Sequence, residues 1–177
     1  MRPSCDQIAP NAPITERDIV SELYWRLRVF CEGYKELQLS THTEIMPVSP
    51  LDEESRHRNL ERLNGNLVDV VILQDTDRNW LSAATKVQGY HGKRKIEARF
   101  KSVPIEFFHT AIEVKIQSNP KDAQSDIDKL LAIRKNNEKC NCFMVLLNAR
   151  GRRKDHDEII SYAAKQGITL IEHTTRT

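Results

Sequence analysis

The chain has 177 residues, 39% of them hydrophobic, which is enough to bury one sizeable core. Its formal net charge of +2 neither requires nor excludes nucleic acid as a partner, because what matters is whether the positive residues cluster. No apolar run approaches membrane-spanning length, and residues 1–13 lack the apolar segment of a secretory signal. We therefore expect a cytoplasmic protein that does not enter the membrane, with one domain over residues 1–177 that begins in a loose N-terminal segment, 1–13.

Several other classes of chemistry find little support in the sequence. The six glycines are scattered and form no phosphate-binding loop, which argues against nucleotide hydrolases and dinucleotide enzymes. The four cysteines suggest no disulfide framework, and Cys140-x-Cys142 lacks the usual ligand spacing of a zinc site. The six histidines show no metalloprotease spacing.

The first predicted helix covers residues 15–31. Thr15 serves as its N-cap, Asp18 completes a capping-box pattern, and apolar residues recur at helical spacing after it. Glu22 lies beside that apolar stripe and stands one turn before Arg26, which is the usual spacing of an exposed ion pair.

Two strands and a charged helix are predicted next. Residues 34–48 form an imperfect strand, and residues 49–63 form a short helix. Residues 66–73 are a near-continuous apolar run, typical of a strand covered on both faces, and Asp69 interrupts it. A lone acid is costly to bury unless a metal ion or a hydrogen-bond donor compensates its charge. Two roles for Asp69 are therefore open, that of a metal ligand and that of a structural residue that accepts hydrogen bonds.

Basic residues gather in two later segments. Residues 80–87 are predicted as a strand or a short helix, 88–92 as a flexible link, and 93–101 as a strand with one apolar and one basic face. The basic residues of this strand are Lys93, Arg94, Lys95, Arg99 and Lys101. Those of a loop nearer the C-terminus are Arg150, Arg152, Arg153 and Lys154. Both groups are candidates for contact with phosphates, which requires only positive charge.

The strand predicted over residues 108–117 carries the most informative pattern. Alternation places Glu113, Lys115 and Gln117 on one face and apolar residues on the other. A carboxylate beside an ammonium on a rigid strand can hold a cation and polarise a water. The alternative is that this face is only the solvent side of an amphipathic strand.

The rest of the chain predicts a helix, a strand, a helix and a strand. Asn119 and Pro120 begin the first helix, and a buried strand follows over residues 142–147. A second helix starts near Asp155, and a last strand covers residues 168–171.

The motifs, taken in order, resemble those of the PD-(D/E)xK nuclease superfamily. Asp69 lies in a hydrophobic strand, Glu113-x-Lys115 lies in a later strand, and a helix follows. The resemblance covers residues 15–173 and implies the restriction-endonuclease-like fold. That fold is an α/β architecture with a central mixed sheet flanked by helices in the order α-β-β-β-α-β, to which this chain adds a terminal helix and strand. The segment between Asp69 and Glu113 is longer than the family leads us to expect, and Asp75 or Asp77 could replace Asp69.

The resemblance also implies a function, a metal-dependent endonuclease acting on DNA. Asp69, Glu113 and the Val114 backbone carbonyl would bind Mg²⁺, for which Mn²⁺ could substitute. Lys115 would orient or help deprotonate the attacking water. Accessory roles would fall to Glu22 and Gln117.

Two questions stay open at this stage. A catalytically silent module of the same fold, binding nucleic acid or a protein partner, is the alternative to an active enzyme. Many members of the superfamily act as dimers, so a homodimer is also open.

Overall fold

The computed structural model describes residues 15–48, 67–74, 85–91, 94–116, 119–148 and 156–174. Its helices are α1 (Glu16–Gly33), α4 (Pro120–Asn136) and α5 (His156–Gln166), with short 3₁₀ turns η2 (Lys35–Leu37) and η3 (Ile105–Phe107). Its strands are β1 (Leu39–Val48), β2 (Val68–Gln74), β3 (Thr85–His91), β4 (Arg94–Pro104), β5 (Phe108–Ile116), β6 (Asn141–Asn148) and β7 (Thr169–Thr174).

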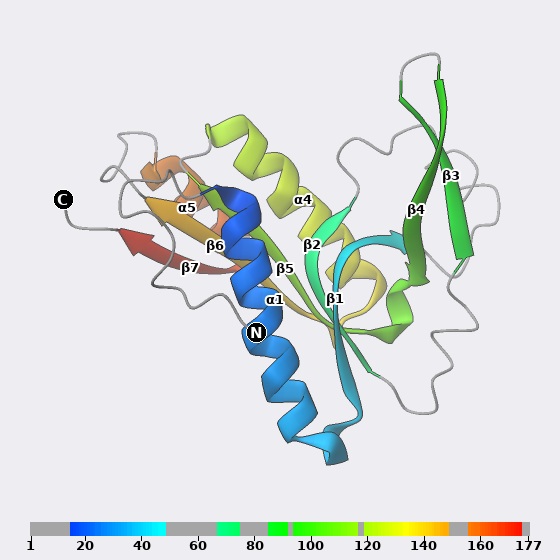
Figure 1. Ribbon diagram of the computed structural model, residues 1–177. Coiled ribbons are helices and arrows are strands. Elements are labelled where there is room, and N and C mark those ends of the chain that lie inside the picture. Colours follow the sequence, from blue (N-terminus) through cyan, green and yellow to red (C-terminus); the bar gives the residue numbers. More distant parts are fainter. Residues whose placement is uncertain are drawn as a thin grey trace, which may run out of the picture.

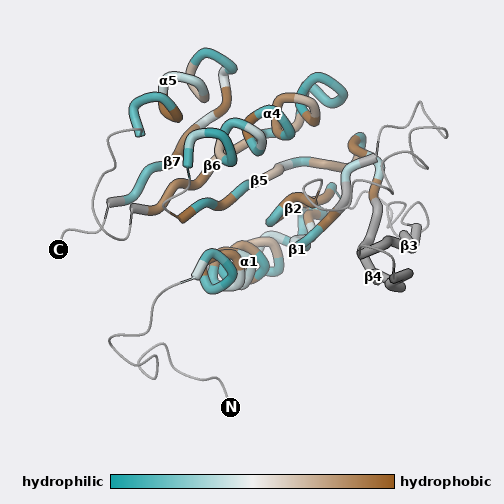
Figure 2. The backbone as a smooth tube through the Cα atoms, turned by 90° about the horizontal axis from the view of Figure 1, so that it is seen from above, coloured by the Kyte–Doolittle hydropathy of each residue, from teal (hydrophilic) through white to brown (hydrophobic). Residues whose placement is uncertain are grey.

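The strands form one mixed sheet between two layers of helices. Its order is β3-β4-β1-β2-β5-β6-β7. The central strands β1, β2 and β5 pair antiparallel, whereas β5, β6 and β7 run parallel. Helix α1 covers one face of the sheet, and α4 and α5 cover the other (Figures 1 and 2). The predicted fold class is confirmed: α1, β1, β2, β5, α4 and β6 follow in the expected order, and α5 and β7 are the added elements.

The long segment between Asp69 and Glu113 contains an extra hairpin. Strands β3 and β4 pair antiparallel with each other, and β4 joins the free edge of β1 by a parallel pairing. The hairpin therefore extends the sheet beyond β1 and leaves β2 and β5 as direct neighbours. The extra length does not separate the two strands that carry the predicted acids.

Local sequence signals explain where two of the helices begin. The Thr15 N–H donates to the Asp18 carboxylate at 2.8 Å, and the Thr15 hydroxyl accepts from the Asp18 N–H at 3.3 Å, which is a complete capping box. In α4, the Asn119 side chain accepts from the Asp122 N–H at 3.0 Å, and Pro120 occupies the first turn. Both predicted starts are confirmed.

Two apolar clusters hold the layers together. The larger fills the space between the sheet and helices α4 and α5, and includes fully buried Ile127, Leu130 and Ile159. The smaller lies under α1 and joins Val70, Ile112 and Val114 to the partly buried apolar stripe of that helix. Strands β2 and β5 are thus covered on both faces, as the apolar run around Asp69 predicts.

One predicted element is wrong and another falls outside the described residues. Residues 88–91, predicted as a flexible link, lie in β3, where the pairing with β4 shifts between Val87 and Gly89. A glycine permits such an irregularity inside a strand, which is why this segment resembled a loop in the sequence. The predicted helix over residues 49–63 lies outside the described residues.

Among the helices that are described, none has both the length and the apolar character needed to cross a bilayer.

Candidate active site

Two acidic side chains face each other across the pairing of β2 with β5. The antiparallel register joins Val70 to Ile112. The next positions along the two strands are Asp69 and Glu113, which the same register places opposite each other. Val70 and Ile112 pack toward α1, so alternation directs the two acids toward α4. Asp69 and Glu113 thus lie on neighbouring strands and on one face of the sheet. That they share a cation and act in catalysis stays a prediction.

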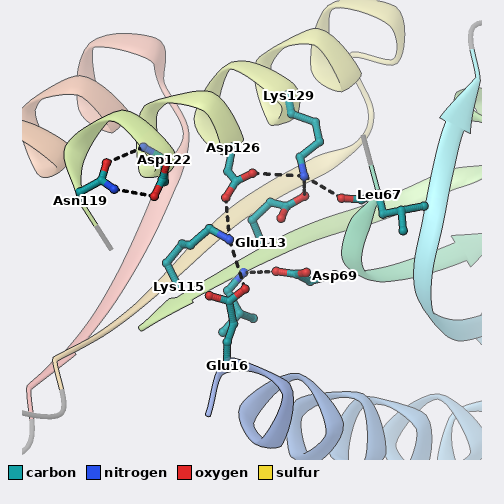
Figure 3. Close-up of polar contacts among 10 residues, drawn as sticks. Glu16, Leu67, Asp69, Glu113, Lys115, Asn119, Asp122, Asp126 and Lys129 are labelled. Carbon is teal, nitrogen blue, oxygen red and sulfur yellow. Dashed lines mark hydrogen bonds and ion pairs between the residues drawn. The ribbon is translucent and has the colours of Figure 1, made fainter. Parts of the chain in front are cut away.

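A backbone donor compensates the charge of Asp69. Its Oδ2 accepts a hydrogen bond of 2.8 Å from the Val114 N–H, just past the last backbone pair between β2 and β5 (Figure 3). The N–H and carbonyl of one strand residue point to the same neighbouring strand, so the Val114 carbonyl also points toward β2. Asp69 is therefore not an isolated charge, and the Val114 carbonyl lies on the side of β5 where Asp69 is found.

Glu113 is almost completely buried, with 1% of its surface exposed. Its Oε1 lies 2.7 Å from the Nζ of Lys129 on α4. Burial raises the pKa of Glu113 well above its ordinary value, the charge of Lys129 opposes this shift, and the charges of Asp69 and Asp126 reinforce it. Glu113 is consequently a carboxylate with a strong demand for a positive partner.

The ammonium group of Lys129 is surrounded by oxygen atoms. Besides its contact with Glu113, it lies 3.2 Å from Oδ1 of Asp126 and donates a hydrogen bond of 2.6 Å to the carbonyl of Leu67 (Figure 3). Burial alone would lower the pKa of Lys129, but the charges of Glu113 and Asp126 outweigh burial and raise it. Lys129 therefore remains charged although only 13% of its side chain is exposed.

The ammonium group of Lys115 joins α4 to α1. It lies 3.0 Å from Oδ2 of Asp126 on α4 and donates a hydrogen bond of 3.2 Å to Oε1 of Glu16 on α1. Burial again would lower the pKa of Lys115, and the charges of Asp126 and Glu16 more than reverse that effect. Lys115 is thus held in place by two carboxylates from opposite layers of the protein.

These contacts form a continuous chain of alternating charge, which we call the acid–lysine network. Its members, from the core outward, are Glu113, Lys129, Asp126, Lys115 and Glu16. Side-chain exposure rises along it from 1% at Glu113 to 41% at Glu16. The network therefore connects a buried carboxylate to the surface of the protein.

The sequence prediction missed three members of the network: Glu16, Asp126 and Lys129. Asp126 and Lys129 stand three residues apart on α4, a spacing that usually indicates an exposed ion pair. The only available signal was that both flank the apolar positions Ile127 and Leu130, which are buried. Glu16 resembles an ordinary first-turn acid, which favours a helix start through its charge.

The predicted accessory residues do not join this network in the described part of the chain. Glu22 forms an exposed ion pair with Arg26, at 2.7 Å, as its alternative interpretation proposed. The acid of α1 that reaches the site is Glu16 instead. Gln117 lies outside the described residues, as do Asp75 and Asp77.

The two basic groups are only partly covered by the structure. Strand β4 contains Arg94, Lys95, Arg99 and Lys101. Lys93 and the loop residues Arg150, Arg152, Arg153 and Lys154 lie outside the described residues. That loop connects β6 to α5, and three strands separate β6 from β4, a distance of roughly 19 Å across the sheet. Contact of both groups with phosphates stays a prediction.

The donors at this site fit a hard divalent cation. Within the described ranges, no three side chains of His, Cys, Asp or Glu converge closely enough to hold a metal. Mg²⁺ does not require that, because it usually takes one or two carboxylates and completes its shell with water and substrate phosphate. Asp69 and Glu113 supply two carboxylates, and Oε1 of buried Glu113 accepts no well-directed hydrogen bond from the described residues. That oxygen lies 2.7 Å from the ammonium of Lys129, so it already faces a positive charge, as a metal-binding oxygen would.

Comparisons with known proteins find solved structures that are similar to this one. No protein-family model matches the chain, and no curated protein matches its sequence. The chain is similar in structure to P. aeruginosa NucC in its cAAA-bound form, with a TM-score of 0.45 and 7% identity over 92% of this chain and 77% of that one. It is also similar to E. coli NucC in its apo form, with a TM-score of 0.47 and 9% identity over 88% of this chain and 74% of that one. The cAAA-bound form of E. coli NucC gives a TM-score of 0.42 at 8% identity, over 91% and 76% of the two chains.

Proposed function

We propose that this chain is a metal-dependent phosphodiesterase, an endonuclease that hydrolyses nucleic acid, with DNA as its preferred substrate. The observation that carries the proposal is the position of Asp69 and Glu113, opposite each other on paired strands, with Lys115 two residues further along β5. Hydrolysis of a phosphodiester requires its negative charge to be neutralised and a water to be presented in line with the leaving oxygen. Two carboxylates and an ammonium on one rigid pair of strands are suited to both tasks.

Each residue has a distinct task in this proposal. Asp69, Glu113 and the Val114 carbonyl would hold Mg²⁺, or Mn²⁺ in its place. When bound, such an ion neutralises phosphate charge and makes a coordinated water more acidic. The raised pKa of Lys115 favours a permanently charged group that orients the water and stabilises charge on the phosphate, rather than a base that removes a proton.

Binding of the substrate would rely on other residues. The basic residues of β4 and of the loop between β6 and α5 would contact phosphates through charge alone, which makes affinity sensitive to salt. This division separates binding from chemistry. Ground-state affinity would come from the basic groups, whereas the acids and Lys115 would act on charge that develops in the transition state.

A cleavage assay tests the proposal. The purified chain is incubated in Mg²⁺ or Mn²⁺ with linear, nicked and branched DNA and with structured RNA. We expect the wild type to cut DNA, and Glu113→Gln and Lys115→Met each to lower the cleavage rate by at least about a hundredfold. DNA affinity should change by less than about threefold, because phosphate contacts lie elsewhere.

Matched substitutions on exposed residues of the same type serve as controls. Glu138 and Lys135 are both exposed, and Glu138→Gln and Lys135→Met remove the same charges without touching the network. Both controls should cut DNA at the wild-type rate. Full activity in Glu113→Gln or in Lys115→Met would contradict the proposal.

A catalytically silent module that binds nucleic acid or a protein partner is the second candidate. The observation that favours it is the 2.7 Å contact between Glu113 and Lys129, because an acid paired with a lysine can be purely structural. A wild-type chain that binds DNA but cuts no substrate form with either metal would favour this candidate.

A further inference from the structure

The surroundings of the Lys129 ammonium are those of a bound cation. Two acidic side chains and one backbone carbonyl contact it, from Glu113 at 2.7 Å, Asp126 at 3.2 Å and Leu67 at 2.6 Å. Carboxylate and carbonyl oxygens are also the ligands that hard divalent cations prefer. Lys129 therefore has the same kind of partners that a metal ion would use at this place.

The same contacts bring Lys129 to one predicted metal-binding acid and to the backbone near the other. It touches Glu113 directly, and its hydrogen bond to Leu67 anchors it two residues before Asp69, at the start of β2 (Figure 3). Asp69 lies opposite Glu113 in the strand register. The ammonium thus lies beside the Glu113 carboxylate, between α4 and the sheet, rather than on the outer surface of α4.

Burial leaves little room for a second cation at Glu113. Only 1% of Glu113 is exposed, and its Oε1 accepts no well-directed hydrogen bond from the described residues although Lys129 is close to it. A divalent ion and an ammonium group repel each other strongly at contact distance in a buried site. Both cannot use this oxygen at once.

We propose that Lys129 competes with the metal ion for Glu113, so that a divalent cation enters the Asp69–Glu113 site only by displacing the ammonium group. This inference rests on the proposed function, since it concerns the metal of that same site. Asp126 keeps the displaced ammonium close by, because it contacts Lys129 independently of Glu113. Lys129 is a positioning residue that sets the metal concentration at which the site is filled.

Metal binding in the absence of nucleic acid tests this directly. Mn²⁺ affinity is measured by isothermal titration calorimetry for the wild type, for Lys129→Met and for the control Lys135→Met on the exposed side of α4. We expect Lys129→Met to bind Mn²⁺ at least about tenfold more tightly, because the competing charge is gone. The control should stay within about twofold of the wild type. Equal or weaker Mn²⁺ binding by Lys129→Met overturns the inference.

A second measurement needs no substitution at Lys129, in case that variant does not fold. The side-chain ammonium of Lys129 is shielded by three oxygen atoms, so its ¹⁵N resonance is observable by NMR in the wild type. Addition of Mg²⁺ should shift or broaden this resonance and leave the backbone amide resonance of exposed Lys135 unchanged. An unchanged Lys129 resonance in Mg²⁺-saturated protein overturns the inference.

The experiment separates failure of this inference from failure of the proposed function. Tighter Mn²⁺ binding by Lys129→Met supports the competition even if no chain cuts nucleic acid, and only the nuclease proposal then fails. DNA cleavage by a wild type whose Mn²⁺ affinity equals that of Lys129→Met overturns the competition and leaves the nuclease proposal intact.

Discussion

Consecutive residues on the two faces of β5 are buried to the same degree, one by apolar packing and the other with an ion pair. Val114 is fully buried and faces the apolar stripe of α1, whereas Glu113 is 1% exposed and faces α4. On the α1 side, packing of apolar surface is sufficient, and its stabilisation is non-directional. On the α4 side, burial of a charge is tolerated only because an ammonium from another element lies within 2.7 Å.

The difference lies in what each face requires of its neighbours. The apolar face tolerates small shifts of α1, because hydrophobic stabilisation depends on buried area rather than on angles. The charged face requires four elements to be in place together. The acid–lysine network takes residues from β5, α4 and α1, and Lys129 of this network also binds a backbone carbonyl at the start of β2. Three predictions test this contrast.

The largest expected effect comes from placing a charge on the apolar face. Val114→Asp would bury a carboxylate among apolar side chains such as Ile112 and Val70. We expect the free energy of unfolding, measured with urea, to fall by about 4 kcal/mol. The same substitution at half-exposed Val29 should cost less than about 0.5 kcal/mol. A small loss at Val114 would show that the two faces do not differ as described.

An intermediate effect should appear in the pH dependence of stability. Burial raises the pKa of Glu113 in the folded protein above its ordinary value of 4.5. The contribution of Glu113 to stability is therefore fully present below pH 4.5 and is lost as pH rises through the folded pKa. Relative to Glu113→Gln, the wild type should therefore lose stability as pH increases above 4.5. Urea unfolding of both proteins across this range measures the difference.

The control for this pH prediction is Glu138→Gln. Glu138 is exposed, so its substitution should leave the pH dependence parallel to that of the wild type. If the wild type instead gained stability over Glu113→Gln as pH rises, the ion pair with Lys129 would outweigh burial.

The smallest effect is expected at Glu22, which the resemblance proposed as an accessory catalytic acid. Its ion pair with Arg26 is exposed, and such pairs contribute about 0.3–0.5 kcal/mol. Glu22→Gln should change the free energy of unfolding by no more than this and should leave the cleavage rate unchanged. Glu16→Gln, which removes a partner of Lys115, should lower the cleavage rate more than Glu22→Gln does. Loss of activity in Glu22→Gln alone would restore Glu22 as a site residue.

The sequence by itself determined the elements and the orientation of the predicted acids. Capping residues such as Thr15 and Asn119 act on backbone groups within one turn, and strand alternation alone places Glu113 and Lys115 opposite Val114. These properties depend on neighbours a few residues apart, so they can be read locally. The same holds for the order of helices and strands, on which the predicted fold class was based.

Only the tertiary structure decided which side chains complete the site. Lys129 and Asp126 reach Glu113 and Lys115 from α4, the next element of the chain, and Glu16 reaches Lys115 from α1, 99 residues away. No local pattern distinguishes these three residues from ordinary surface charges. The structure also decided that the extra hairpin extends the far edge of the sheet and leaves β2 beside β5. Ion pairing acts over a few ångströms in space without regard to separation along the chain, so the partners of a buried charge become visible only once the layers have packed.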